Sequence, residues 1–358
     1  MIEVNRGLLM TTLIGALALA SCARSIADPS PRTDLMVFSA VASHSIALQR
    51  KSIITTTNYP LDEPFVVEAV HYPNGDESAM GETFMAKEPI SYDFENMLWK
   101  SDSVFFWPER GKLVFYAGSP ILPNVTIGPE NGVEADWSIP DNDATQTDLC
   151  FAKTVEMCEM HPEAVPIVFI HALSQICLKA RTIQNYSHSY TEGNIIQSNV
   201  VNIVLDSVKV HGIVSKGHFT QIPRGWSYDP ADTVSYTVFR SKEGLNLKVD
   251  RYDNPELERL TTILLIPQIL SEDACLEEWH HAEVRTSLTD TSTGQIVSDL
   301  SYTIPQTSVI YFSDICEKWI MDFKYTLRLS VGLNGDKSTL AVAVTDWTET
   351  KEIILGDE

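Results

Sequence analysis

Short runs in which apolar and polar residues alternate dominate this chain, and they predict β-strands. Apolar side chains occupy every second position of residues 325–331, so a strand there turns them all to one face. Residues 340–344 repeat the pattern after Asn334-Gly335. Asn-Gly between two alternating runs favours a tight hairpin, because both residues accept a positive φ.

The sequence pattern predicts strands over most of the chain. Residues 201–210 alternate but change phase, which predicts a bulge near Asp206. Residues 127–147 are rich in Gly, Pro, Asn and Asp and are expected to form a long loop. Single helical turns are expected at 93–98 and 257–260. Further strands are expected at 35–42, 65–71, 104–107, 112–117, 166–171, 233–239, 262–266, 282–288 and 308–312.

The predicted strands gather on both sides of residue 160, and His161-Pro162 lies between the two groups. This spacing predicts an all-β chain of two β-sandwich domains in tandem, at residues 34–160 and 161–358. Residues 22–33 before them are mostly small and polar and include two prolines, so they are expected to form a flexible tether.

Residues 1–21 have the layout of a lipoprotein signal peptide. Arg6 precedes an apolar run that begins near Gly7 and ends in Leu19-Ala20-Ser21-Cys22. The run is too short for a permanent transmembrane helix, which needs about 20 apolar residues, and it matches a signal-peptide core followed by small residues. Cys22 would then be acylated with diacylglyceryl and palmitate chains that anchor the protein. The alternative is an ordinary cleaved signal peptide in which Cys22 is incidental.

The residue composition of the chain restricts the classes of partner that it can bind. The chain has 358 residues, a formal net charge of −22 and 44% hydrophobic residues, which is enough for an ordinary core. The excess of acidic residues argues against binding to nucleic acid, because phosphate binding needs clustered Lys and Arg. It also argues against a protein that lies flat on an anionic membrane.

Six cysteines are present, so acylation of Cys22 leaves an odd number. The other five do not have zinc-ligand spacing. Cys150 and Cys158 could form a disulfide, but free buried thiols are the favoured interpretation.

Known catalytic and phosphate-binding motifs are absent from the sequence, and no cofactor or metal is expected. The acidic stretch 140–143 lacks the Gly and the closing Glu of a calcium loop. His280-His281 would point to opposite faces of a strand and would not chelate together. His171 lies in an apolar run and is expected to be a hydrogen-bonded core residue. Glu277-Glu278 could act as an acid-base pair, but any acidic surface could supply one.

Two tryptophans are the candidates for ligand binding. Trp137 and Trp226 lie on segments that look like loops, whereas most other aromatic residues lie within predicted strands and are assigned to the core.

VFIHALSQI at 168–176 is similar to an F-x-H-A-L-S-K-I element and is the most specific of several matching segments. Together these segments resemble the fimbrillin family of pilus-subunit lipoproteins from anaerobic Gram-negative bacteria. Between Trp319 and Tyr325, this chain lacks the Pro-Gly turn that the family often has. The other matching segments are SVFFWP at 103–108, LVFYA at 113–117, QTDLCFA at 146–152, 201–219, LLIPQIL at 264–270, 319–329 and 342–347.

The resemblance implies two transthyretin-like β-sandwich domains, export as a lipoprotein and assembly by strand exchange. In such subunits a protease removes the first strand after a basic residue, and a strand from a neighbouring subunit takes its place. Here the first strand would be residues 35–42 and the processing site Arg50. The donor strand would come from the C-terminal stretch that contains Trp347, Ile353, Ile354 and Leu355.

The resulting interpretation is a non-enzymatic structural or adhesive subunit of fimbriae at the outer membrane. Its partners would be other fimbrial subunits, the membrane through the lipid, and glycan or protein receptors if it lies at a fibre tip. One alternative is a glycan-binding surface lipoprotein that does not polymerise. Another is a hydrolase on a β-sandwich.

Overall fold

The computed structural model describes residues 35–42, 59–140, 145–249, 261–313, 315–333, 337–347 and 353–355. Within these residues the chain is all-β, with one short 3-10 turn, η2 (Cys158–Met160). The predicted fold class is therefore confirmed at this level. No described helix is long and apolar enough to span a membrane.

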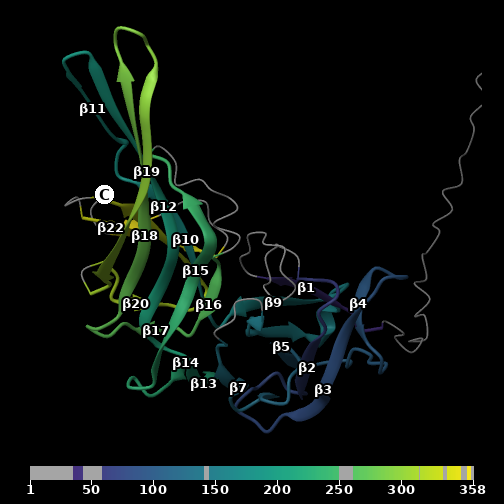
Figure 1. Ribbon diagram of the computed structural model, residues 1–358. Coiled ribbons are helices and arrows are strands. Elements are labelled where there is room, and N and C mark those ends of the chain that lie inside the picture. Colours follow the sequence, from purple (N-terminus) through teal and green to yellow (C-terminus); the bar gives the residue numbers. More distant parts are fainter. Residues whose placement is uncertain are drawn as a thin grey trace, which may run out of the picture. The chain divides into compact units, whose positions relative to one another are not determined.

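The first part of the described chain forms a closed barrel (Figure 1). The neighbour order is β1 (Phe38–Ala42), β4 (Leu98–Ser101), β3 (Glu82–Asp93), β2 (Phe65–Tyr72), β5 (Lys112–Ser119), β8 (Cys150–Met157) and β9 (Val165–His171). The pairing of β1 with β9 is parallel, whereas the other pairings in the barrel are antiparallel.

Three further sheets follow. One runs β14 (Arg224–Ser227), β13 (Lys216–Gln221), β7 (Gly132–Ser138) and β6 (Val125–Gly128). The second runs β16 (Ile263–Leu265), β10 (Ser174–Thr182), β21 (Phe323–Val331), β22 (Thr339–Asp346) and β23 (Ile353–Leu355). The third runs β11 (Tyr186–Glu192), β12 (Ile195–Val214), β18 (Cys275–Asp290) and β19 (Ile296–Tyr311), with β15 (Thr233–Asn246) also paired to β12. β17 (Gln268–Ile269) and β20 (Lys318–Trp319) form a separate pair.

The alternation in β5 places its side chains in two different cores. Leu113, Phe115 and Ala117 point into the barrel, where they join the buried cluster of β1, β2 and β9. Val114 and Tyr116 point the other way and join the cluster of the remaining sheets. One strand with a period of two thus contributes to both hydrophobic cores.

Several strand predictions are confirmed. β21 and β22 pair antiparallel as the alternation of 325–331 and 340–344 predicts, although Asn334-Gly335 lies outside the described residues. The register between β12 and β18 shifts between Leu205 and Ser207, which confirms the bulge at Asp206. The five described cysteines are free, and all but Cys275 are buried.

Other predictions are wrong. Residues 127–147 are not one long loop, because β6 and β7 form a hairpin there. The Gly, Pro and Asn residues mark its tight turn, at which Gly132 has φ +66°. Residues 104–107 do not form a strand, because only Phe106 makes an isolated bridge, to Leu35.

The two expected helical turns have different outcomes. Residues 94–97 form a turn between β3 and β4, in which the Asp93 carboxylate accepts hydrogen bonds from the backbone N–H groups of Glu95 and Asn96. The stretch 257–260 lies outside the described residues.

The division of the chain at residue 160 remains a prediction. β9 begins after that point and pairs with β1 and β8, so the barrel extends to His171. The sheet β14-β13-β7-β6 also combines strands from both sides of residue 160.

Candidate functional site

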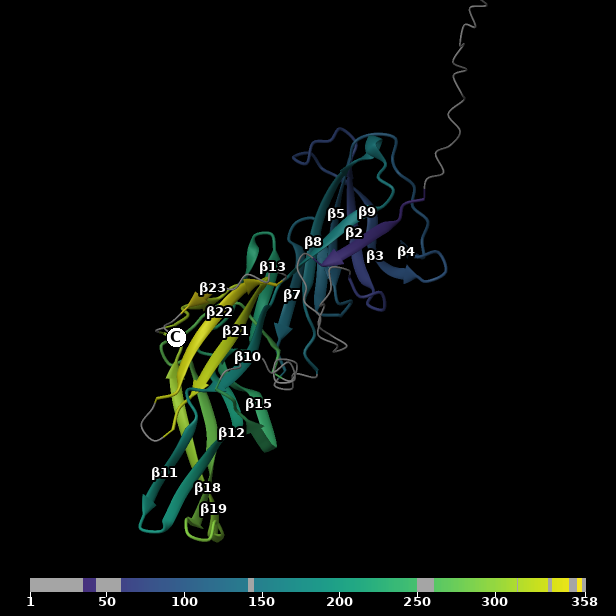
Figure 2. The same ribbon diagram turned by 90° about the horizontal axis from the view of Figure 1, so that it is seen from above.

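β1, the purple arrow in Figure 2, is the first described strand. Its inner side chains are buried in the barrel. Phe38, Ala40 and Ala42 are buried, whereas Ser39 between them is exposed. The strand pairs in parallel with β9 over five positions, from Phe38↔Val165 to Ala42↔Phe169. On its other side it pairs with β4 at one position, Phe38↔Trp99. Both the burial of these side chains and the backbone hydrogen bonds therefore hold β1 in the barrel.

An aromatic cluster lines the part of the barrel that β1 occupies. We call this cluster the β1 seat, and its members are Tyr59, Phe65, Trp99 and Phe169. The Tyr59 ring lies 4.7 Å from the Phe169 ring and 5.5 Å from the Trp99 ring, between centroids. The Tyr59 backbone N–H donates to the Ala40 carbonyl at 3.4 Å, so the seat and β1 are joined directly. Removal of β1 would expose these rings to water.

The Tyr59 hydroxyl group hydrogen-bonds the Ser119 hydroxyl group at 2.5 Å inside the barrel. Burial raises the pKa of Tyr59 far above its ordinary value, so the phenol stays protonated. This bond fixes the ring that contacts the other three members of the seat.

The C-terminal candidates lie in two places. Trp347 is fully buried directly after β22, where its ring stacks on His171. Ile353, Ile354 and Leu355 form β23, which pairs antiparallel with β22 at the edge of its sheet. Of the predicted donor residues, the structure thus places one in the core and three on a sheet edge of the same chain.

His171 is the centre of a buried polar cluster and confirms the expectation of a hydrogen-bonded core histidine. Its Nδ1 lies 2.5 Å from Asp148 Oδ2 and 3.5 Å from Cys150 Sγ. Its backbone N–H donates to Asp322 Oδ1 at 3.3 Å. The cluster ties the end of β9 to residues near the start of β21.

Among the described residues, the group that could hold a metal ion is formed by Asp148, Cys150 and His171. Their ligand atoms lie within 4.8 Å of one another. Burial, with the neighbouring Asp148 carboxylate, raises the pKa of the Cys150 thiol well above its ordinary value. The protonated thiol lies within hydrogen-bond distance of His171 Nδ1. We interpret the group as a hydrogen-bond network.

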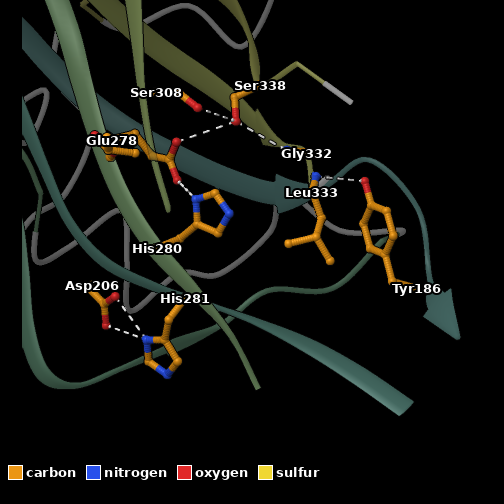
Figure 3. Close-up of polar contacts among 10 residues, drawn as sticks. Tyr186, Asp206, Glu278, His280, His281, Ser308, Gly332, Leu333 and Ser338 are labelled. Atoms are coloured by element: carbon orange, nitrogen blue, oxygen red, sulfur yellow. Dashed lines mark hydrogen bonds and ion pairs between the residues drawn. The ribbon is translucent and has the colours of Figure 1, made fainter. Parts of the chain in front are cut away.

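A second buried polar cluster lies in the β12-β18-β19 sheet (Figure 3). Glu278 and His280 are both buried, and the carboxylate of Glu278 contacts His280 Nδ1. Ser338 Oγ donates to the other carboxylate oxygen at 3.4 Å and also lies 3.2 Å from Ser308 Oγ. Glu278 therefore belongs to a buried hydrogen-bond network, whereas Glu277 contacts Trp279 at the surface.

Adjacent His281 lies on the other face of β18, as expected for neighbours in a strand. Its Nδ1 is 2.9 Å from Asp206 Oδ2, and its Nε2 is 3.5 Å from Glu283 Oε1. The two histidines therefore have separate partners and share no site, in agreement with the sequence.

The interpretation of Trp137 and Trp226 as loop aromatics is wrong. Trp137 lies in β7 and is buried, while Trp226 lies in β14 and donates its indole N–H to the Ala172 carbonyl at 2.7 Å. Both alternate with polar neighbours in short strands, a signal that the surrounding Gly and Asp residues hide.

Cys22 and Arg50 lie outside the described residues, so their predicted roles in lipidation and processing remain predictions. Sequence reasoning missed Tyr59 and the β1 seat. The signal was weak, because Tyr59 follows a stretch without alternation, and its three ring partners come from three separate strands.

Comparison with known proteins gives the family. A model of the fimbrillin-like family matches residues 64–347. No curated protein matches the chain. A fimbrial protein from Bacteroides vulgatus shares 15% identity, with a TM-score of 0.54, over 87% of this chain and 99% of that one. A protein from Bacteroides uniformis, provisionally described as a cell adhesion protein, has 12% identity and a TM-score of 0.48, over 88% and 100% of the two chains. The match over residues 64–347 spans the strands from β2 to β22, and the chain therefore belongs to the fimbrillin-like family.

Proposed function

We propose that this chain is a structural or adhesive subunit of surface fimbriae, and that it exchanges strands with neighbouring subunits. Membership of the fimbrillin-like family supports a fimbrial or adhesion role. The fold is shared with a fimbrial protein of Bacteroides vulgatus. In this proposal the chain comprises two transthyretin-like domains and performs no catalysis.

The observation that carries the proposal is the position of β1. It is the leading strand of a barrel whose other pairings are antiparallel, and it is held by one parallel partner and a single pair on its other side. Parallel pairing is slightly less stable for each residue than antiparallel pairing. A leading strand can also leave without unthreading the rest of the chain.

The place of Arg50 fits the same proposal. β1 ends at Ala42 and the seat begins at Tyr59, so a cut after Arg50 separates the strand covalently from its barrel. From then on only hydrogen bonds and the burial of Phe38, Ala40 and Ala42 retain β1. A neighbour's strand with equal pairing and better apolar contacts would replace it.

The donor in this proposal is the C-terminal stretch that includes β23. β23 has three paired positions on β22 and lies at the end of its sheet, so its transfer to another molecule breaks few contacts. Trp347 stays behind as the buried point at which the donor segment leaves the core.

Export completes the proposal. Acylation at Cys22 would carry the precursor to the outer membrane, and cleavage after Arg50 would release it from the lipid. A subunit that escapes cleavage would keep both its lipid and β1, and would serve as the membrane anchor of a fibre.

Mass spectrometry of the surface form tests the proposal. Assembled subunits should begin directly after Arg50, and the precursor should carry lipid on Cys22. Arg50→Ala should keep the lipid and prevent assembly, whereas the matched Lys51→Ala should process normally. A surface population that begins wholly at Cys22, without assembly into larger species, would leave the non-polymerising lipoprotein as the better account.

A further inference from the structure

The β12-β18-β19 sheet ends on β19, and no described strand pairs with the outer edge of β19. Two long hairpins build this region, β11–β12 and β18–β19, and they run side by side because Ile195 pairs with Asp290 near their tips (Figure 1). Among the described strands, the backbone N–H and C=O groups on the outer edge of residues 296–304 therefore have no ladder partner.

The two edges of this sheet differ in how they are protected. On the far side of β12, β15 carries Arg240, Lys242 and Glu243 and pairs with three register shifts. Nearer the hairpin tips that side is formed by β11, which carries one acidic residue, Glu192. β19 is 16 residues long and carries one charged residue, Asp299. Because 21% of the chain is charged, 0.21 × 16 gives about three charges in an average strand of this length. Charges and irregular pairing are the usual protection of an edge. β19 has only one charged residue and one register shift, which lies between Ile296 and Ser298.

The half of β19 nearest the hairpin tip also exposes apolar side chains. Ile296, Val297, Leu300 and Tyr302 are 62%, 56%, 61% and 52% exposed. Tyr302 pairs with Val284 and Leu300 pairs with Thr286, which are 6% and 7% exposed. Leu300 and Tyr302 therefore continue the core face of the sheet beyond the residues that cover it. Exposed apolar side chains on an unpaired edge are typical of a docking strand.

Charge indicates which partner fits. The chain has a net charge of −22, so two copies repel one another wherever their surfaces are acidic. The single carboxylate of β19, Asp299, lies 2.7 Å from Arg285 on β18 and is neutralised as an ion pair. The edge is therefore a neutral strip on an acidic molecule, and a second copy can approach it without that repulsion.

Pro305 interrupts the outer edge of β19. Pro305 cannot donate a backbone hydrogen bond, so it limits continuous pairing to the stretch from Ile296 to Ile304. This stretch contains all four of the exposed apolar residues and the neutralised Asp299.

We propose that residues 296–304 of β19 pair antiparallel with the same residues of a second copy, about a two-fold axis. The joined sheet would run β11-β12-β18-β19 in one copy and continue through β19 of the other. This surface is separate from β1 and β23, and the proposal does not depend on strand exchange.

Light scattering of the full chain in mild detergent tests it. The chain should show a dimer mass, and Leu300→Lys should raise the dissociation constant at least tenfold, because the symmetry introduces two charges at the contact. Met80→Lys is the matched control, since Met80 is 96% exposed on the barrel and should leave the dimer unchanged. Arg50→Ala should also leave it unchanged, which separates this proposal from strand exchange.

Cross-linking provides a second measurement that does not depend on the stability of a variant. Leu300→Cys, which the two-fold axis places opposite the same residue of the other copy, should form a disulfide between copies under mild oxidation. Val155→Cys, at an exposed site of the barrel, should not. A chain that is monomeric at all concentrations would overturn the proposal. So would a dimer that Leu300→Lys leaves intact and that cross-links equally at both positions.

Discussion

The rings of His171 and Trp347 lie parallel, with their centroids 3.9 Å apart and their planes 4° apart. His171 ends β9 in the barrel, and Trp347 directly follows β22. Both side chains are fully buried. The stack therefore fastens the end of the β22 strand to the barrel, at the point where the proposed donor segment begins.

Trp347→Ala should lower the free energy of unfolding by about 3–5 kcal/mol, as loss of a buried aromatic side chain usually does. Trp347→Phe should cost much less, because it keeps an aromatic ring and removes an indole N–H that has no hydrogen-bond partner among the described residues. Denaturant titration measures both. Equal losses for the two variants would show that the stack does not hold this segment.

The buried Glu278–His280 pair allows a comparison within one strand. Glu278→Ala removes the partner of a buried histidine and of Ser338, and should cost about 3–5 kcal/mol. His281→Ala on the opposite face breaks a part-exposed pair with Asp206 and should cost no more than about 1 kcal/mol. Similar losses for both, measured by thermal and chemical unfolding, would contradict the assignment of Glu278 to the core.

His281 should contribute a pH-dependent part of the stability. Burial lowers its pKa, but hydrogen bonds and charge from Asp206 and Glu283 outweigh that effect and leave the pKa above its ordinary value. The folded state thus binds this proton more tightly than the unfolded state. The contribution is full below the ordinary pKa of about 6.5 and is lost as pH rises through the raised one.

Unfolding free energies of the wild type and His281→Gln, measured from acid to mildly alkaline pH, check this expectation. Their difference should shrink as pH rises. Asp206→Asn should weaken the same dependence, because it removes the first of the carboxylates that raise the pKa. A difference that stays constant over the whole range would show that His281 titrates as it does in the unfolded chain.

Locking β1 should prevent strand exchange. Val41 and Val168 are paired positions of β1 and β9, so cysteines there lie within disulfide reach. The oxidised double variant should not assemble, and reduction should restore assembly. The control is Ser91→Cys with Lys100→Cys, which joins β3 to β4 and leaves β1 free. Assembly of the oxidised Val41–Val168 variant would exclude release of β1.

The strand pattern could be predicted from local alternation where one face of a strand is buried. This is why the β21–β22 hairpin and the bulge at Asp206 agree with the sequence. The alternation of apolar and polar residues does not predict most of β19, because both faces of this strand are largely exposed beyond the core. It also misled at 104–107, where an apolar run has no neighbouring strand to pair with and forms only a single bridge.

The candidate site was less predictable because it depends on long-range pairing. The first strand could be located by its pattern, but its parallel partner β9 lies more than a hundred residues away. Tyr59 gives no periodic signal, and its importance follows from ring contacts to Phe65, Trp99 and Phe169. The burial of Trp347 against His171 likewise requires the folded arrangement.

Unboiled gels of the surface form, from wild type and from the Val41–Val168 lock variant, test the central claim most directly. The account predicts a ladder of subunit multiples in the wild type and in the reduced variant, and monomer alone in the oxidised variant. A ladder that persists when β1 is locked to β9 would contradict it.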